Sequence, residues 1–301
     1  MHPVLFHIFS FPIHSYGFML ALSFLIGIWL ASYRAKKAGL DKNVIADVGF
    51  YVILAAIVGS RLYYVLLHSE EFQGNITAIF NPFQGGTVGI GGLVMYGGFI
   101  GAILAGFIYF KARKLPFHPY ADAIAPAVGI GIALTRIGCF LNGCCYGAGL
   151  PEHTSYAVNF PLSSPAGMYQ YHIHAAGLYP SQLFESIGGL VIVATVLWVG
   201  RYRIFTGFQF YLVGLMYSVL RFAVDFSRYY GHNERLGPLS HNQVVCIILF
   251  VIFAGLILKN VLFKEEPAAL PVAVADGSST AGSAPQDAMP HEQLSAPTDQ
   301  K

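Results

Sequence analysis

Seven long apolar segments recur along the chain, and shorter stretches between them hold most of the charged residues. Each segment is about 20 residues long, which is the length that an α-helix needs to cross the hydrocarbon core of a bilayer. No alternation of polar and apolar residues with a period of two favours a β-barrel. The pattern predicts membrane-spanning helices at about residues 15–33, 46–67, 88–110, 119–141, 181–200, 206–225 and 242–263.

Composition supports the membrane interpretation. Only 11% of the 301 residues are Asp, Glu, Lys or Arg, whereas an ordinary soluble domain has about 25%. Hydrophobic residues make up 55% and the mean hydropathy is +0.58, which excludes a disordered chain. A formal net charge of +2 also disfavours a nucleic-acid-binding protein, which concentrates basic residues on one face. We therefore expect an all-α, polytopic membrane protein.

The Lys and Arg residues between the segments are unevenly distributed. Twelve of the seventeen fall after the first, third and fifth segments or at the C-terminal end, and only Arg228 and Arg235 fall on the opposite side. Because cytoplasmic loops carry the excess of Lys and Arg, the pattern predicts an outside N-terminus and a cytoplasmic C-terminus. The loop at about residues 148–179 holds neither Lys nor Arg, and it is expected to face outward.

The chain divides into a membrane domain, residues 1–264, and a tail, residues 265–301. The tail is rich in Ala, Pro, Ser and Gly and has no aromatic residue. A segment of this composition cannot bury enough apolar surface to fold, so we expect a disordered cytoplasmic tail.

Three arginines, Arg61, Arg136 and Arg221, lie inside the predicted spans. A charge there costs at least about 2.5 kcal/mol and is a functional candidate by default. All three lie in the outer-leaflet half of spans that run outward. The nearby acidic residues are Glu185 and Asp225, of which Asp225 is one helical turn after Arg221.

Two explanations account for these intramembrane charges. The first is structural: ion pairs, or side chains that snorkel to the interface. The second is an anionic ligand, because three guanidinium groups exceed the acids available to them. Guanidinium donates bidentately to phosphate through its planar fork. At the outer leaflet, the phosphate expected is that of a phospholipid headgroup.

A polar, glycine-rich segment, TRIGCFLNGCCYG, surrounds Arg136. Asn142 contributes an amide, and the glycines allow a close approach of backbone or ligand. Cys144 and Cys145 are expected to face an oxidising compartment as thiols, a disulfide or metal ligands, although vicinal cysteines lack the usual zinc spacing. Simple packing of small residues at a helix end is the alternative explanation.

Other polar residues give weaker signals. Tyr96 lies between glycine pairs, and a buried tyrosine hydroxyl requires a partner, although most membrane tyrosines are interface or packing residues. His172 and His174 form an H-x-H pair without two further ligands nearby in the sequence, so no metal site is predicted. His14 and Tyr16 are interpreted as interface anchors at the first span.

Seven motifs occur in the same order as in a known family. They are HSYGFML at the first span, GSRLYYVL around Arg61, YGGFIGA around Tyr96, DAIAPAVGIGIALTRIGCFLNGCCYG around Arg136, YPSQLFE at 179–185, LRFAVDFSR around Arg221 and NQVVCI at 242–247. Over about residues 10–262 the chain therefore resembles the bacterial prolipoprotein diacylglyceryl transferases. The segment around Arg136 is similar to the family signature.

The resemblance implies a reaction. These enzymes transfer the diacylglyceryl group of phosphatidylglycerol to the lipobox cysteine thiol in the signal peptide of a prolipoprotein. A thioether forms and glycerol-1-phosphate leaves. The resemblance also implies a bacterial cytoplasmic membrane location with an active site toward the outer leaflet. No metal or organic cofactor is expected, because fixed positive charges would help the phosphate to leave. The residues expected to bind phosphatidylglycerol are Arg61, Arg136, Arg221, Tyr16, Asn142, Gly147 and Gln182.

Three positions differ from one well-known form of the family. Tyr96 replaces a histidine, Cys144 replaces a glutamate, and Asp225 replaces a glutamate with a carboxylate of shorter reach. These differences leave the identity of the proton acceptor open. The attacking species is a thiolate, and our hypothesis is that Arg136 and Arg221 favour this thiolate and neutralise the leaving phosphate. The expected catalytic set is completed by Asp225 and by Tyr96, which would orient the headgroup or relay a proton.

Two other functions compete with this interpretation. One is a divergent relative that uses another acceptor, and the other is a non-enzymatic protein that binds or transports anionic lipid. Transporters of many folds show inverted repeats and broken helices at the midplane. In this chain the polar residues are instead expected to gather toward one leaflet.

Overall fold

The computed structural model describes residues 2–9, 11–72, 94–150, 154–202, 204–230 and 235–263. Within these ranges the chain is mostly helical, and seven helices have 18 or more residues. These helices are α1 (Ser15–Lys37), α2 (Lys42–Leu67), α4 (Met95–Ala112), α5 (Phe117–Asn142), α7 (Ser181–Val199), α8 (Phe208–Asp225) and α9 (His241–Leu262). Each overlaps one predicted span, and the predicted tail lies outside the described residues.

Five of these helices are long and apolar enough to cross a membrane, namely α1, α2, α5, α7 and α9. The prediction of a polytopic helical membrane protein is confirmed to that extent. The apolar part of α4 is shorter, at Tyr96–Ala112, and the first residues of its predicted span lie outside the described ranges. Helix α8 carries Gln209, Arg221 and Asp225, which lower its hydropathy.

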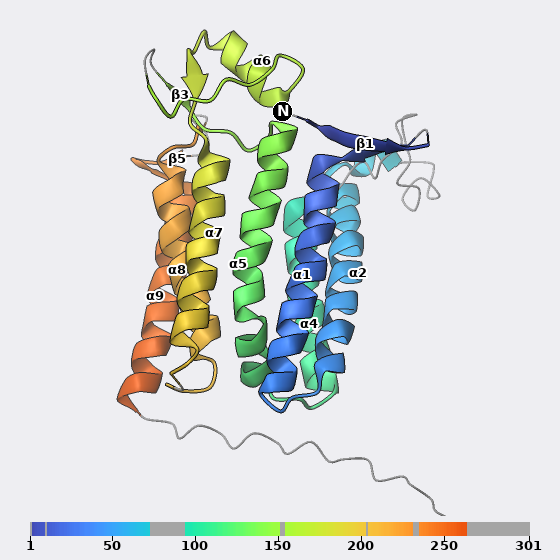
Figure 1. Cartoon of the computed structure of the whole chain (residues 1–301), viewed down its shortest axis with the longest axis vertical. Coiled ribbons are helices and arrows are strands. Elements are labelled where there is room, and N and C mark those ends of the chain that lie inside the picture. The colour runs from blue at the N-terminus through green and yellow to red at the C-terminus, as the bar shows by residue number, and fades with distance from the viewer. Residues whose placement is uncertain are drawn as a thin grey trace, which may run out of the picture.

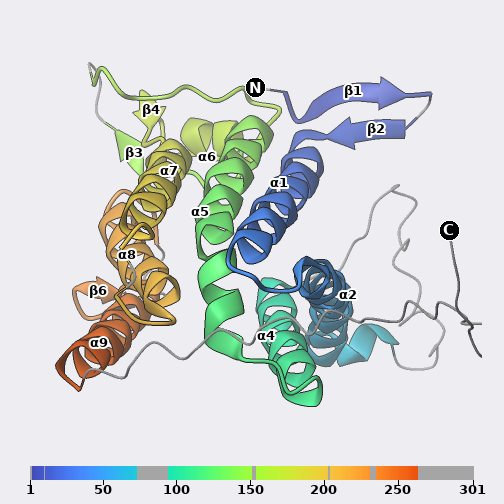
Figure 2. The same ribbon diagram turned by 60° about the horizontal axis from the view of Figure 1, so that its bottom comes forward.

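The helices pack side by side in a row that does not follow their order in the chain. Contacts join α4 to α2, α2 to α1, α1 to α5, α5 to α7 and α8, and α8 to α9. Figures 1 and 2 show α2 and α4 on the opposite side of α1 and α5 from α8 and α9. The bundle is therefore built around α5.

Small residues allow these helices to approach closely. A Cβ atom at Gly129 of α5 would lie 2.7 Å from Val193 Cγ2 and 2.9 Å from the carbonyl oxygen of Gly189, both on α7. Backbones that approach without intervening side chains are typical of helix pairs in membranes. Pro126 is buried within α5, and the helix continues through it, as expected where neighbouring protein tolerates the interruption.

Short elements gather at one end of the helices (Figure 1). They are the antiparallel pairs β1 (Val4–Ile8) with β2 (Phe11–His14), β3 (Gly149–Leu150) with β4 (Gly177–Leu178), and β5 (Arg235–Leu236) with β6 (Leu239–Ser240), and helix α6 (Pro165–His172). A 3₁₀ turn, Ser69–Phe72, follows α2. The described residues of the segment 148–179, which lacks Lys and Arg, belong to this end, whereas α1, α4 and α7 end at the opposite one.

The opposite end has its own polar contacts. The Asp122 carboxylate accepts hydrogen bonds from the backbone amides of Gly207 at 2.6 Å and Phe210 at 3.0 Å. These amides begin α8, where a carboxylate satisfies amides that have no partner within the helix. Arg34 donates to Gln209 Oε1 at 2.5 Å and to the Asp122 carbonyl at 3.3 Å. Helices α1, α5 and α8 are therefore held together at this end as well.

Candidate functional site

One buried carboxylate, that of Glu185, lies among three arginines. Glu185 is on the second turn of α7 and is 0% exposed. Its Oε1 is 2.9 Å from Arg136 Nη2, and its Oε2 is 3.5 Å from Arg228 Nη2 and 3.8 Å from Arg221 Nη1. The carboxylate therefore joins α5, α7 and α8 near the end of the bundle that carries the segment 148–179.

A second buried carboxylate, Asp225, orients Arg221. The two side chains pair at 3.2 Å, one helical turn apart. Asp225 also accepts hydrogen bonds from the hydroxyls of Tyr230 and Ser240. The Tyr230 oxygen in turn accepts from Arg221 Nη2 at 3.2 Å and from Asn242 Nδ2 at 3.0 Å. Burial raises the pKa of Tyr230, and its hydrogen bond to Asp225 acts in the same direction, so this hydroxyl remains a donor.

The cluster formed by Arg136, Arg221, Arg228, Glu185 and Asp225 carries an excess of positive charge. Three guanidinium groups face two carboxylates, which leaves one positive charge when all five are ionised. Arg221 Nη1 and Arg228 Nε and Nη2 are buried and make no hydrogen bond with a described residue. Arg221 Nη1 and Arg228 Nη2 face Glu185 Oε2 only at ion-pair distances of 3.8 and 3.5 Å. Buried donors without a hydrogen bond require an explanation, and the oxygens of a bound anion would serve as acceptors for them.

The end of α5 presents Arg136 to this cluster. The helix ends at Asn142 because Gly143 adopts a left-handed conformation with φ of 72°, which favours glycine. A Cβ atom at Gly143 would also lie 2.6 Å from Ser164 Cβ. In the following turn, the carbonyl of Cys144 accepts a hydrogen bond from Gln182 Nε2 at 2.8 Å. Gln182 is fully buried on α7, so it fixes the turn against that helix.

Three other predicted site residues lie around the same turn. The Asn142 side chain lies close enough to the Cys144 thiol to interact with it. The backbone of Gly147 donates to the Tyr179 carbonyl at 3.1 Å, and no room remains there for a Cβ atom. Tyr16 lies at the start of α1, close enough to Arg136 to interact with it electrostatically. Seven predicted residues, Arg136, Arg221, Asp225, Gln182, Asn142, Gly147 and Tyr16, are therefore brought to one region.

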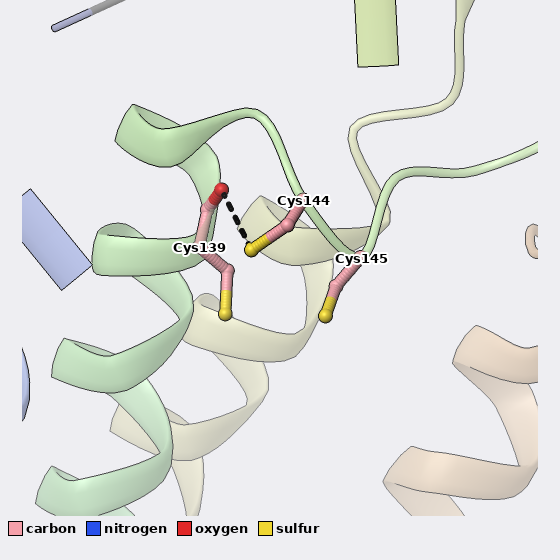
Figure 3. Close-up of side chains that lie close together, drawn as sticks. All are labelled: Cys139, Cys144 and Cys145. Carbon is pink, nitrogen blue, oxygen red and sulfur yellow. Dashed lines mark hydrogen bonds between the residues drawn. The ribbon is translucent and has the colours of Figure 1, made fainter. Parts of the chain in front are cut away.

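Cysteines form a compact group in this region (Figure 3). The sulfur atoms of Cys139, Cys144 and Cys145 all lie within 4.8 Å of one another, and all three cysteines are free thiols. Hydrogen bonding with the other two thiols lowers the pKa of Cys145, and the positive charges of Arg136 and Arg228 act in the same direction. Cys145 is exposed, whereas Cys139 is buried.

The structure places Arg61 and Tyr96 elsewhere. Arg61 lies on α2 with its guanidinium carbon 5.6 Å from the ring centroid of Tyr64 and 5.5 Å from that of Phe72. Tyr96 lies on the first turn of α4, is 61% exposed and makes no hydrogen bond with a described residue. Both helices lie across α1 from α8 (Figure 2), so the roles of Arg61 and Tyr96 stay predictions.

His172 and His174 do not approach a third metal ligand in the part of the chain that is described. His172 ends α6, and His174 follows in the turn after it.

An apolar groove lies between α8 and α9 next to the cluster. Its volume is about 180 Å³, and its lining residues are Ser218, Val219, Phe222, Cys246, Ile247 and Phe250. Cys246 lies close enough to Arg221, Asp225 and Glu185 to interact with them electrostatically. The groove therefore provides an apolar surface adjacent to the buried charges.

Comparisons with known proteins identify the family to which the chain belongs. The family described as prolipoprotein diacylglyceryl transferase matches residues 3–259. The chain belongs to this family. Its relatives named phosphatidylglycerol–prolipoprotein diacylglyceryl transferase include one from Bacillus cytotoxicus, 31% identical over 82% of this chain and 87% of the relative. One from Clostridium tetani is 31% identical over 87% of this chain and 98% of the relative. A third, from Clostridium botulinum, is 29% identical over 88% and 99%.

Family membership makes the chain a transferase of lipoprotein biosynthesis. The structure adds three residues to the predicted site, Arg228, Tyr230 and Cys139. Arg228 was counted only as a loop charge, although it lies three residues after Asp225 within LRFAVDFSR. Tyr230, two residues further on, was not selected. Cys139 was passed over because it lies inside the helix, five residues before Cys144.

Proposed function

We propose that this prolipoprotein diacylglyceryl transferase moves the diacylglyceryl group of phosphatidylglycerol onto the lipobox cysteine thiol of prolipoproteins. This is the first step of lipoprotein maturation. The observation that carries the proposal is the cluster of three arginines with Glu185 and Asp225, which has one positive charge in excess. The names of the relatives supply the lipid and the protein substrate.

The proposed reaction replaces a carbon–oxygen bond at the glyceryl carbon with a carbon–sulfur bond. The cysteine thiol gives up its proton, which ends on the departing phosphate monoester or in solvent, its sulfur attacks that carbon, and a thioether forms. The carbon–oxygen bond to phosphate breaks, and glycerol-1-phosphate leaves with the bonding electrons. In this scheme Arg136 and Arg221 bind the phosphate and stabilise the charge that develops on it, and Asp225 holds Arg221 in place. Arg228 adds a third positive charge.

The remaining predicted residues take supporting roles. Gln182, Asn142 and Gly147 fix the turn after α5, and Tyr16 lies where it would contact the lipid headgroup. Arg61 and Tyr96 lie on the other side of α1, so we assign them to headgroup entry or orientation at the outer leaflet. The apolar groove between α8 and α9 would accommodate an acyl chain while the phosphate reaches Arg221.

The proposal includes a topology. All seven long helices would span the bacterial cytoplasmic membrane, with the N-terminus outside and the C-terminus in the cytoplasm. The distribution of Lys and Arg supports this orientation. It would place the arginine cluster and the segment 148–179 toward the outer leaflet, where phosphatidylglycerol and the translocated signal peptide meet.

Complementation tests the function. The chain is expressed in cells depleted of their own diacylglyceryl transferase, and a lipoprotein precursor is followed by its electrophoretic mobility. We expect the mature mobility to return with the chain and not with Arg136→Lys expressed at the same level. A membrane-inserted chain that binds phosphatidylglycerol without restoring modification would instead indicate a lipid-binding protein.

A further inference from the structure

The three clustered cysteines take no part in the proposed transfer. Their sulfur atoms lie within 4.8 Å of one another, and Figure 3 shows them directed into one space between the end of α5 and the turn that follows. Cys139 comes from the last helical turn, and Cys144 and Cys145 come from the loop. Two different backbone conformations therefore direct three thiols to one point.

The turn is held in a conformation that sets this geometry. Cys145 has a φ of 58°, in the left-handed region that residues other than glycine rarely adopt. Such conformations persist where the surroundings enforce them, and they cluster at functional sites. Here Gln182 holds the carbonyl of Cys144 at 2.8 Å, and the Cys144 amide donates to the Cys139 carbonyl at 3.0 Å. These contacts keep the vicinal thiols beside the helix.

Three thiolates at this spacing fit a thiophilic cation. A zinc–sulfur bond is about 2.3 Å long, so three sulfurs around one ion lie about 4 Å apart. Sulfurs already within 4.8 Å of one another need to move little to bind. Thiolate ligands select soft or borderline ions such as Cu⁺ and Zn²⁺. Because Cys145 is exposed, an ion can reach the group without a change of fold.

Neighbouring charges balance such a complex. An ion with three thiolates carries a net negative charge, which is two for Cu⁺ and one for Zn²⁺. Arg136 Nη1 is 3.9 Å from the sulfur of Cys139, and both Arg136 and Arg228 interact electrostatically with Cys145. The cationic surroundings therefore favour the bound thiolates rather than opposing them.

We propose that Cys139, Cys144 and Cys145 form a binding site for one thiophilic metal ion of the Cu⁺ or Zn²⁺ type. Each thiol gives its proton to solvent as it binds. Three sulfurs complete a trigonal site for Cu⁺, whereas Zn²⁺ would take a fourth ligand at an open position. The site adjoins Arg136 but does not depend on the proposed transfer reaction.

Metal titration tests the site directly. The full-length protein in detergent is reduced, treated with a chelator, and titrated with Zn²⁺ and, in a separate anaerobic experiment, with Cu⁺. We expect one ion per chain and an X-ray absorption spectrum with a sulfur shell at about 2.3 Å for Zn²⁺. A three-sulfur shell alone for Cu⁺, and an additional oxygen or nitrogen for Zn²⁺, would distinguish the two modes.

Substitutions assign the ligands. We expect the metal affinity to fall by at least about 10–100-fold, the loss typical when a residue that only supports a metal ligand is removed, in each of Cys139→Ser, Cys144→Ser and Cys145→Ser. Cys246→Ser is the matched control, because Cys246 is a free cysteine on α9 outside the group. The metal affinity of this variant should equal that of the unsubstituted protein. The double substitution of His172 and His174 by Ala should also leave binding intact.

A measurement on the unsubstituted protein tests the site even if the serine variants fail to fold. Metal should slow the alkylation of Cys145 in the unsubstituted protein, as read by peptide mass spectrometry. The proposal is overturned if metal gives no protection, if the absorption spectrum contains no sulfur shell, or if all three serine variants bind normally. It is also overturned if protein taken directly from membranes contains a disulfide within this group.

Discussion

Glu185 Oε1 lies 2.9 Å from Arg136 Nη2, and this ion pair joins α7 to α5 beneath the segment 148–179. The same carboxylate also approaches Arg221 and Arg228 through its second oxygen. A single fully buried acid therefore sets the mutual positions of all three guanidinium groups.

Replacing this acid should destabilise the protein. Glu185→Gln keeps the size of the side chain but leaves three partly buried arginines around a neutral group. Breaking a fully buried ion pair on one side costs about 3–5 kcal/mol, which is the upper bound for this site. Thermal unfolding in detergent measures the loss. Glu70→Gln, at an exposed glutamate after α2, is the control and should leave the midpoint unchanged. Equal midpoints for the two variants would contradict the central role of Glu185.

Replacing Arg136 or Arg221 by lysine should strongly reduce the transfer activity. Arg136→Lys and Arg221→Lys keep the charge but remove the planar fork that donates bidentately to phosphate. Loss of such a donor costs about 10²–10³-fold in rate, measured as transfer of labelled diacylglyceryl to a lipobox peptide. Arg61→Lys should retain more activity, and Arg113→Lys, near the opposite end of the bundle, should retain all of it. Full activity in the Arg136 and Arg221 variants would remove the assignment to phosphate.

Replacing Tyr96 should slow the transfer less than the loss of a general base would. Its side chain is 61% exposed and makes no hydrogen bond with a described residue, so we expect Tyr96→Phe to reduce the transfer rate by less than about tenfold. Loss of a general base costs about 10²–10⁴-fold, and a decrease of that size would show that Tyr96 relays the proton. Tyr96→His should preserve activity. Tyr33→Phe, at an exposed tyrosine on α1, serves as the control.

Deprotonation of Tyr230 should destabilise the folded protein at alkaline pH. Its folded pKa is raised, so the stabilisation by its hydroxyl is fully present below the unfolded value of about 10. It is lost as the pH rises from that value through the folded pKa. The unfolding midpoint of the unsubstituted protein should therefore approach that of Tyr230→Phe above pH about 10. A constant difference between the two proteins across this range would exclude the contribution of Tyr230.

The orientation can be tested with fusions. A reporter that is active only in the cytoplasm should be active after residue 114 or 203 and silent near residue 165. The reason is that twelve basic residues fall on one side of the predicted spans and two on the other. Activity near residue 165 would place the arginine cluster at the inner leaflet and contradict the proposed reaction.

The positions of the long helices followed from the sequence because hydropathy is a local property. Each of the seven predicted spans overlaps a helix, and the hairpin β1–β2 and helix α6 were not predicted, because their short segments lack a long apolar run. The approach of Arg221 to Arg136 was expected from their similar depth. Depth along the membrane normal does not fix lateral position, however. For this reason the sequence did not show that Arg228 approaches Glu185, or that Arg61 lies on α2, across α1 from α8.

Short-range patterns also missed the cysteine group. Cys144 and Cys145 were visible as a pair, but the third sulfur reaches them only because α5 ends at a left-handed glycine. The sequence alone does not specify how that turn folds back beside Cys139. Tyr230 was missed for a related reason, since its partners Asp225 and Asn242 lie on separate helices or at their ends.

The order of the two residues in the Arg136–Glu185 pair has a consequence for biosynthesis. Glu185 follows Arg136 by 49 residues, so the ribosome delivers the arginine to the membrane before its counter-ion has been made. A nascent chain that ends after α5 carries a charge whose burial costs at least about 2.5 kcal/mol. The end of α5 that carries Arg136 is therefore expected to remain at the water interface until α7 emerges, and the bundle closes around its charges only as the second half of the chain is inserted.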